Sequence, residues 1–172
     1  MYFITVAILT IAQRIYELKV AKENTQNLLS HGGVEFGAKH YWMLVTLHTL
    51  FFSGMFIEAF LRGVHPPEIW PILFALFLTA QAGRAWVIRT LHGRWTTRIL
   101  VVPGEKLVDK GPFKIVPHPN YMIVAVEILT LPLIFGLYYT SIIFTVLNAL
   151  VLLAVRIPEE RRALNWATKS NH

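Results

Sequence analysis

Long apolar runs constrain the fold of this chain more than any other feature. A membrane-spanning helix needs roughly 20 mainly apolar residues, and several runs approach that length. They cover residues 1–20, 41–61, 69–91, 121–139 and 140–157. Apolar residues make up 55% of the 172 positions and the mean hydropathy is +0.50, values typical of a membrane protein. We therefore expect an all-α polytopic membrane protein with about five transmembrane helices, in a single membrane domain over residues 1–172.

The ends of this array have their own signals. The first run has neither the basic segment nor the small-residue cleavage site of a signal peptide, so we expect a retained helix. Gly136 and the short LYYTS stretch allow only a tight turn between the last two runs, so we expect an antiparallel hairpin.

Basic residues predict how the helices are oriented. With the N-terminus outside, the loops near residues 20–40 and 92–120 and the C-terminal tail all lie inside and hold most of the lysines and arginines. The two outer loops hold only Arg62. Such a bias sets membrane orientation, so we expect a cytoplasmic C-terminus. The net charge of +6 is then a topology signal, and we expect no nucleic-acid partner.

The longest inner loop, residues 93–121, reads GRWTTRILVVPGEKLVDKGPFKIVPHPNY. Loops of this length without regular structure are usually functional or disordered, and its many apolar residues argue against disorder. Pro117 and Pro119 should hold His118 in an extended conformation, because a residue before proline avoids the helical region. We expect Asn120 to be the N-cap of the fourth span.

A second polar cluster, RIPEERR, begins where the fifth span leaves the membrane on the same inner side. On one helix, Arg156, Glu159 and Glu160 would share a face. Pro158 should either kink that helix or begin a new one. The following residues predict a short amphipathic helix on the membrane surface.

Charged residues inside the spans are costly in lipid and are functional candidates. Glu127 in the fourth run either lines a substrate cavity or pairs with Arg84 in the third, and the pairing is favoured. The chain has no cysteine and no close set of histidine, aspartate and glutamate with ligand spacing, so we expect no metal.

These motifs resemble the isoprenylcysteine carboxyl methyltransferase family of integral membrane methyltransferases. The likeness covers about residues 94–165: GPF-x4-HPNY opens one hydrophobic helix, and a second helix ends in R-x3-E. The upstream KLVDKGPF resembles the family's approach to this motif. Pro117 stands where the family usually has arginine, and Phe113 replaces a frequent tyrosine. The resemblance implies a cytoplasmic pocket for S-adenosylmethionine, closed by the C-terminal helices.

By position, the resemblance implies a set of residues that contact the cofactor. They are Glu105, Lys106, Leu107, Val108, Phe113, His118, Pro119, Asn120, Tyr121 and Glu160. Arg156 would orient the substrate and, with Glu160, form the catalytic pair, while Glu127 is the further candidate for a substrate contact. Residues 1–92 would then supply three transmembrane helices, and residues 93–172 the catalytic part.

The implied reaction is O-methylation of a lipophilic acceptor drawn from the bilayer of a bacterial cell membrane. Small members of the family resemble enzymes that methylate alkylpyrones and related polyketides, and the larger eukaryotic members act on prenylcysteine. A carboxylate or acidic enol is already ionised near pH 7, so the site must chiefly position donor and acceptor. A guanidinium can clamp such an anion through two hydrogen bonds, a role that suits Arg156.

Two alternatives remain. Membrane sterol reductases end in a similar histidine-proline-asparagine-tyrosine motif and use NADPH, but they are longer, and 172 residues leave little room for their extra cofactor-binding sequence. The other alternative is a non-catalytic membrane scaffold.

Overall fold

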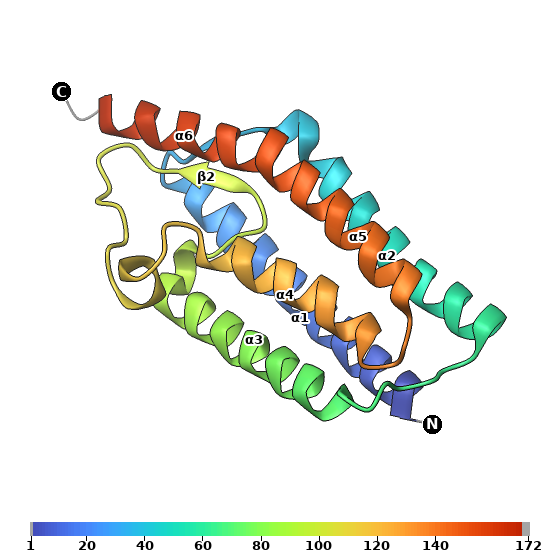
Figure 1. The fold of residues 1–172 in the computed structure, drawn as a ribbon. Coiled ribbons are helices and arrows are strands. Elements are labelled where there is room, and N and C mark those ends of the chain that lie inside the picture. The colour runs from blue at the N-terminus through green and yellow to red at the C-terminus, as the bar shows by residue number, and fades with distance from the viewer. Residues whose placement is uncertain (1, 170–172) are drawn as a thin grey trace. The chain divides into compact units, whose positions relative to one another are not determined.

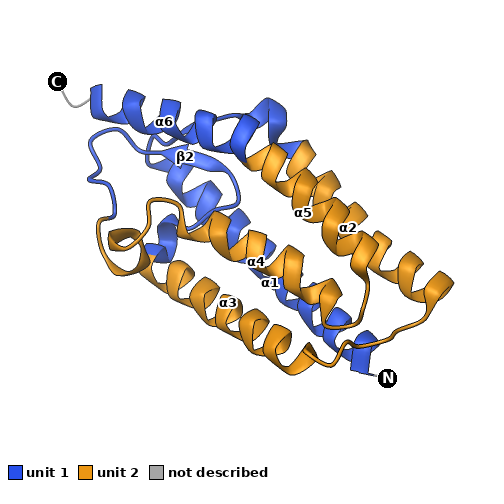
Figure 2. Cartoon of the chain, in the orientation of Figure 1, with its two compact units in different colours: residues 1–42, 91–108, 153–172 blue, residues 43–90, 109–152 orange. Residues whose placement is uncertain are grey.

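The computed structural model describes residues 2–169 and is predominantly helical (Figure 1). Met1, with which the first predicted span begins, lies outside the described residues. The chain forms two compact units, each built from separate segments (Figure 2). Unit 1 comprises residues 1–42, 91–108 and 153–172, and unit 2 comprises residues 43–90 and 109–152.

Most of the apolar helices belong to unit 2. They are α2 (Tyr41–Arg62), α3 (Trp70–Leu91), α4 (Pro119–Leu133) and α5 (Tyr138–Val151), except that Tyr41 and Trp42 of α2 and Leu91 of α3 belong to unit 1. Among the described residues, three helical segments are long and apolar enough to cross a membrane: Ala38–Arg62, Trp70–Arg94 and Tyr138–Lys169. These segments match three of the five predicted spans.

The other two predicted spans differ from expectation. α4 is apolar but has only 15 residues, because the helix ends at Leu133 and not near residue 139. α1 (Tyr2–Ser30) continues well past the predicted end near residue 20, and it is not among the three segments that meet the length and hydropathy of a span. Its second half is polar and helical, because residues such as lysine, glutamate and glutamine are good helix formers.

The predicted antiparallel hairpin of α4 and α5 is confirmed (Figure 1). Pro132 lies in the last turn of α4. In the connection, Gly136 has a left-handed φ of 74°, a backbone conformation that residues other than glycine rarely adopt. Across the hairpin, the hydroxyl of Ser141 donates to the carbonyl oxygen of Leu129 at 2.7 Å.

Unit 1 contains a two-stranded antiparallel ribbon that the sequence does not predict. Strand β1 (Val34–Phe36) pairs with β2 (Ile99–Val101), and Glu35 lies opposite Leu100. The architecture is therefore not purely α-helical as expected, because this ribbon gives part of the long inner loop a regular structure. Each strand has only three residues, too few for an alternating pattern to stand out.

α6 (Ile157–Lys169) packs on both strands within unit 1, and Figure 1 shows it beside β2. Its buried residues are Ala163 and Ala167, and the rings of Trp166 and Phe36 lie 5.5 Å apart. The expected short C-terminal helix is thus present, and part of its apolar surface is covered by the ribbon.

A π-helical turn, Leu152–Arg156, leads directly into α6. Pro158 is the second residue of α6, where its missing N–H removes a bond to the preceding turn. Helical residues run without a break from Tyr138 to Lys169, so Pro158 does not begin a separate helix, and the π turn just before it is the local departure from regular α-helix. The wider turn ends at Arg156, and π turns of this kind are frequent at functional sites.

Candidate functional site

The HPNY motif forms the first turn of α4 in unit 2. His118 is the N-cap residue, with φ −129° and ψ 63°, and Pro119 follows at the first helical position. Pro119 suits that position because its φ is preset and no N–H is needed there. The expectation that Asn120 caps the helix is therefore wrong, since the helix begins two residues earlier than that cap would place it. His118 is held out of the helical region, as predicted, although its ψ falls short of a fully extended value.

This first turn brings an aromatic pair and an amide together. The rings of His118 and Tyr121 are stacked, with centroids 5.4 Å apart and an interplanar angle of 20°. Asn120 Oδ1 is buried and has no hydrogen-bond partner among residues 2–169. A buried amide oxygen of this kind is a ready acceptor for a ligand hydroxyl or amino group.

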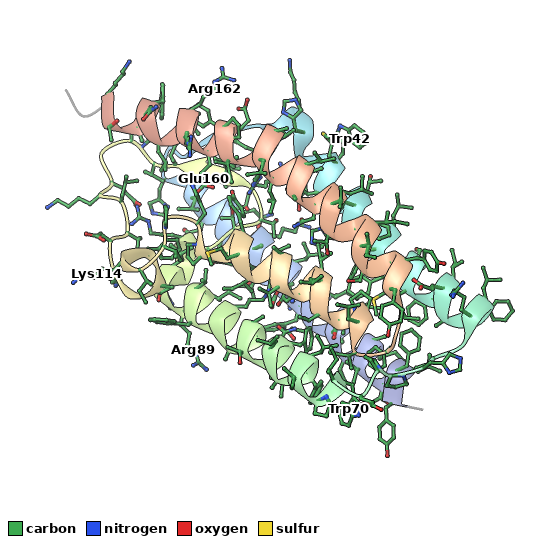
Figure 3. All side chains as sticks on the ribbon, in the orientation of Figure 1. Trp42, Trp70, Arg89, Lys114, Glu160 and Arg162 are labelled. Atoms are coloured by element: carbon green, nitrogen blue, oxygen red, sulfur yellow. The ribbon has the colours of Figure 1, made fainter. Side chains whose placement is uncertain are left out.

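Phe113 lies just before this turn, in a 3-10 helix formed by Gly111–Lys114 (Figure 3 labels Lys114). Gly111 has a φ of 58°, and a Cβ at this position would lie 2.7 Å from Thr90 Oγ1 on α3. Glycine therefore permits a close approach between the loop and α3 that a side chain would block. Phe113 itself is half-buried.

The second group of predicted cofactor contacts, residues 105–108, belongs to unit 1. Glu105, Lys106 and Leu107 are exposed and Val108 is half-buried. Arg94 holds this segment: its Nη1 donates to the carbonyl oxygen of Lys106 at 3.0 Å, and its Nη2 forms an ion pair with Glu105.

Arg156 and Glu160 also lie in unit 1, four residues apart. Arg156 Nη2 donates to the carbonyl oxygen of Thr97 at 2.8 Å. Glu159 forms an ion pair with Arg162, also at 2.8 Å. Figure 3 shows Glu160 and Arg162 on opposite sides of α6, and Glu160 is half-buried where Arg162 is exposed. Glu160 is thus the more sheltered of these two charged groups.

The predicted site residues are therefore divided between the units. Unit 2 holds Phe113, His118, Pro119, Asn120, Tyr121 and Glu127, and unit 1 holds Glu105, Lys106, Leu107, Val108, Arg156 and Glu160. Within unit 2, the structure brings His118 and Tyr121 into contact. Within unit 1, it anchors residues 105–106 to Arg94 and Arg156 to Thr97.

The expected pairing of Glu127 with Arg84 is confirmed inside unit 2. Arg84 Nε donates to Glu127 Oε1 at 2.9 Å, and Arg84 Nη2 donates to the other carboxylate oxygen. Both residues are buried. A substrate contact by Glu127 stays a prediction. Among residues 2–169, no group of three histidine, aspartate or glutamate residues is placed to hold a metal ion.

Sequence reasoning missed the residues that support this site, above all Arg94, Thr97 and Tyr41. Tyr41 OH lies 3.0 Å from Thr97 Oγ1. The contact between Tyr41 and Thr97 joins parts of the chain that the pairing of β1 with β2 brings together from distant positions in the sequence. In the sequence, the polar stretch GRWTTR at residues 93–98, which contains Arg94 and Thr97, was the only feature that could have indicated these residues.

Comparisons with known proteins agree with the motifs. The sequence profile of the isoprenylcysteine carboxyl methyltransferase family matches residues 72–166. The uncharacterized protein YpbQ of Bacillus subtilis is 43% identical over 164 residues, covering 95% of this chain and 96% of that protein. An uncharacterized protein of Haemophilus influenzae is 29% identical over 167 residues, covering 96% of each chain. No solved structure matches significantly.

The family match contains both the HPNY turn and the Arg156–Glu160 pair. The three helices of spanning length agree with a membrane location. The chain therefore belongs to the isoprenylcysteine carboxyl methyltransferase family, and this membership implies a membrane methyltransferase.

Proposed function

We propose that this protein is an integral membrane O-methyltransferase that uses S-adenosylmethionine to methylate a carboxylate, enol or phenol oxygen of a lipophilic acceptor. The observation that carries the proposal is the family match over residues 72–166, which includes both the HPNY motif and the R-x3-E motif. Two local features support it: the buried acceptor Asn120 Oδ1 in the same helical turn as a stacked aromatic pair, and an anchored arginine in the R-x3-E motif.

The proposed cofactor contacts are those expected from the resemblance. Asn120 Oδ1 would accept a hydrogen bond from a ribose hydroxyl or the adenine amino group, and the His118–Tyr121 pair would offer an aromatic surface to the purine. Glu160 would bind the amino-acid ammonium or the ribose hydroxyls. When bound, the cofactor supplies a sulfonium-activated methyl group.

Arg156 would hold the acceptor. A guanidinium carries five N–H donors in a rigid plane, so it can bind a protein carbonyl and an acidic oxygen at once. The bond to Thr97 would fix the plane of the group, and the acceptor anion would then be oriented for in-line attack. An acceptor that is ionised at neutral pH needs no strong general base.

The acceptor would enter from the bilayer and the cofactor from the cytoplasm. In this proposal α1 and α4 complete five spans, the N-terminus lies outside, and the long loop and α6 face the cytoplasm, as the basic residues predict. The acceptor would be an alkylpyrone-like polyketide or a prenylcysteine-like molecule, because each joins an acidic oxygen to a long apolar tail.

Ligand binding tests the proposal directly. The purified full-length protein in detergent is titrated with S-adenosylhomocysteine and, in parallel, with NADPH, and binding is followed by calorimetry and thermal shift. We expect saturable binding of S-adenosylhomocysteine alone. Saturable NADPH binding would favour the reductase alternative, and no binding of either ligand at millimolar concentration would overturn the proposal.

Turnover is measured with methyl-tritiated S-adenosylmethionine. Two acceptor probes are used, a 6-alkyl-4-hydroxy-2-pyrone and N-acetyl-S-farnesylcysteine, and the label is counted in the organic extract. Transfer to the pyrone alone would indicate an enol acceptor, and transfer to the farnesylcysteine alone a carboxylate acceptor.

A further inference from the structure

The segment Arg94–Arg98 connects the separate parts of unit 1 through hydrogen bonds. Arg94 binds residues 105–106, and the carbonyl oxygen of Trp95 accepts a bond from the Asn24 side chain at 2.8 Å. The carbonyl oxygen of Thr97 accepts the bond from Arg156. The segment therefore anchors the guanidinium of Arg156 through the carbonyl oxygen of Thr97.

Thr97 is fixed from both sides. Its hydroxyl lies 3.0 Å from the hydroxyl of Tyr41, at the start of α2. The neighbouring Thr96 closes a tight local turn, because its hydroxyl donates to the carbonyl oxygen of Arg98 at 2.7 Å and accepts from the backbone N–H of Arg98 at 3.0 Å. The Thr97 carbonyl that receives Arg156 thus belongs to a constrained backbone.

Tyr41 is contacted by Arg98, and Arg98 is in turn bound by Glu35. The guanidinium carbon of Arg98 lies 4.8 Å from the centroid of the Tyr41 ring, a cation–π distance. Arg98 Nη1 also donates to both oxygens of Glu35, at 2.8 and 3.0 Å. Glu35 lies in β1, so the pairing of β1 with β2 fixes the far end of this series of contacts.

We propose that Tyr41 and Thr97 are positioning residues that orient Arg156 toward the methyl acceptor. The inference rests on the proposed function of Arg156, and it assigns a role to Tyr41, which precedes the residues 72–166 matched by the family. Arg156 has a long side chain with several rotatable bonds, so fixing it in advance lowers the entropic cost of binding the acceptor. Loss of the Tyr41 hydroxyl would free the Thr97 side chain and loosen the carbonyl that anchors Arg156.

The test uses variants that remove single hydroxyls. Tyr41→Phe keeps the ring under Arg98, and Thr97→Val keeps the carbonyl that binds Arg156. We expect each to raise the KM for the acceptor about fivefold, the effect of one ordinary hydrogen bond. The double variant should be no worse than either single variant, because both remove the same bond. The affinity for S-adenosylhomocysteine should not change, and the melting temperature should fall by no more than about 2–4 °C, the effect of about 1 kcal/mol of stability.

A second readout does not depend on turnover. Phenylglyoxal modifies accessible arginines, and peptide mass spectrometry gives the rate at each residue. Tyr41→Phe and Thr97→Val should speed modification at Arg156 and leave the rate at exposed Arg162 unchanged. Tyr16→Phe, which removes an exposed hydroxyl from α1 of the same unit, is the matched control and should change neither rate nor KM.

The outcomes separate the two proposals. Unchanged modification at Arg156, or faster modification with an unchanged acceptor KM, would overturn the positioning role. A fall in melting temperature together with weaker S-adenosylhomocysteine binding would also overturn it, because the hydroxyls would then be merely structural. Wild-type protein that binds no S-adenosylhomocysteine would instead refute the proposed function, and the modification rates would still decide whether Tyr41 and Thr97 hold Arg156.

Discussion

Arg84 on α3 and Glu127 on α4 form a two-point ion pair inside unit 2, and both side chains are less than one-tenth exposed. Removing one partner of a buried pair leaves an uncompensated charge, which costs about 3–5 kcal/mol. We expect Arg84→Met and Glu127→Met each to destabilise the protein by about this amount, and the double variant to recover most of the loss. Unfolding by titrated SDS in mixed micelles measures the difference.

Arg89→Met is the matched control, because Arg89 lies on the same helix and is exposed (Figure 3). It should change the free energy of unfolding by less than about 0.5 kcal/mol. If the Arg84 variant were no less stable than the Arg89 variant, the ion pair would not hold α3 to α4.

Glu58 on α2 caps the start of α5. Its carboxylate accepts bonds from the backbone N–H groups of Tyr139 and Thr140, at 3.1 and 2.7 Å, and from the Thr140 hydroxyl at 2.6 Å. A negative charge at a helix N-terminus is favourable, and these N–H groups have no partner within the helix. Glu58→Ala should cost about 1–3 kcal/mol of stability, measured by the same SDS titration.

Glu68→Ala supplies the comparison, since Glu68 is exposed in the loop after α2. Thr140→Val removes only the side-chain bond and should lose less than Glu58→Ala. Equal losses in the two variants would mean that the backbone N–H groups contribute nothing.

Gly136 in the hairpin connection should not tolerate a side chain. Its φ is left-handed, and a Cβ would lie 2.1 Å from the carbonyl oxygen of His65, far inside van der Waals contact. The backbone conformation alone costs about 1–2 kcal/mol for alanine, and the overlap adds to it. We expect Gly136→Ala to lower the melting temperature and the yield of folded protein, whereas Gly93→Ala, with nothing within 4 Å and an ordinary φ, should be tolerated.

Asn148 on α5 is 1% exposed, and neither its amide nitrogen nor its oxygen has a hydrogen-bond partner among the described residues. A buried polar group without a partner costs about 1–3 kcal/mol. Asn148→Leu, which is similar in size, should therefore raise the melting temperature. A lower melting temperature would show that the amide is hydrogen-bonded in the membrane, for example to water.

Arg156→Ala should separate binding from turnover. The variant loses the group proposed to hold the acceptor but keeps the residues proposed to bind the cofactor. We expect S-adenosylhomocysteine affinity within about threefold of wild type and methyl transfer reduced at least 100-fold, since orientation by such a clamp is worth several kcal/mol. Loss of both activities together would show that Arg156 organises the cofactor site.

The sequence predicts those parts of the fold that depend on local patterns. Apolar runs of about 20 residues predict α2, α3 and the segment beginning with α5, because the bilayer demands that length. A chemical argument about unpaired charge in lipid predicts the Arg84–Glu127 pair.

Features that depend on distant segments were not predictable in this way. The pairing of Glu35 with Leu100 has no periodic signature, and Asn120 loses the cap position because Pro119 moves the helix start. The motifs around His118 and Arg156 mark candidate ligands. Tyr41, which contacts Thr97, could be identified only once the pairing of β1 with β2 was known.

Unit 1 draws on the first, middle and last parts of the chain, and this dictates when it can be completed during synthesis. β1 leaves the ribosome long before β2, and both must wait for α6, which ends at the last described residue. Unit 2, whose last segment ends at residue 152, has all its residues available earlier. Since domains fold as units, a nascent protein arrested before α6 would have all residues of unit 2 and both strands of the ribbon synthesised, while the strands still lacked the helix that packs on them. A nonsense mutation within the codons of α6 would therefore leave β1, a strand made long before α6, without the helix that packs on it.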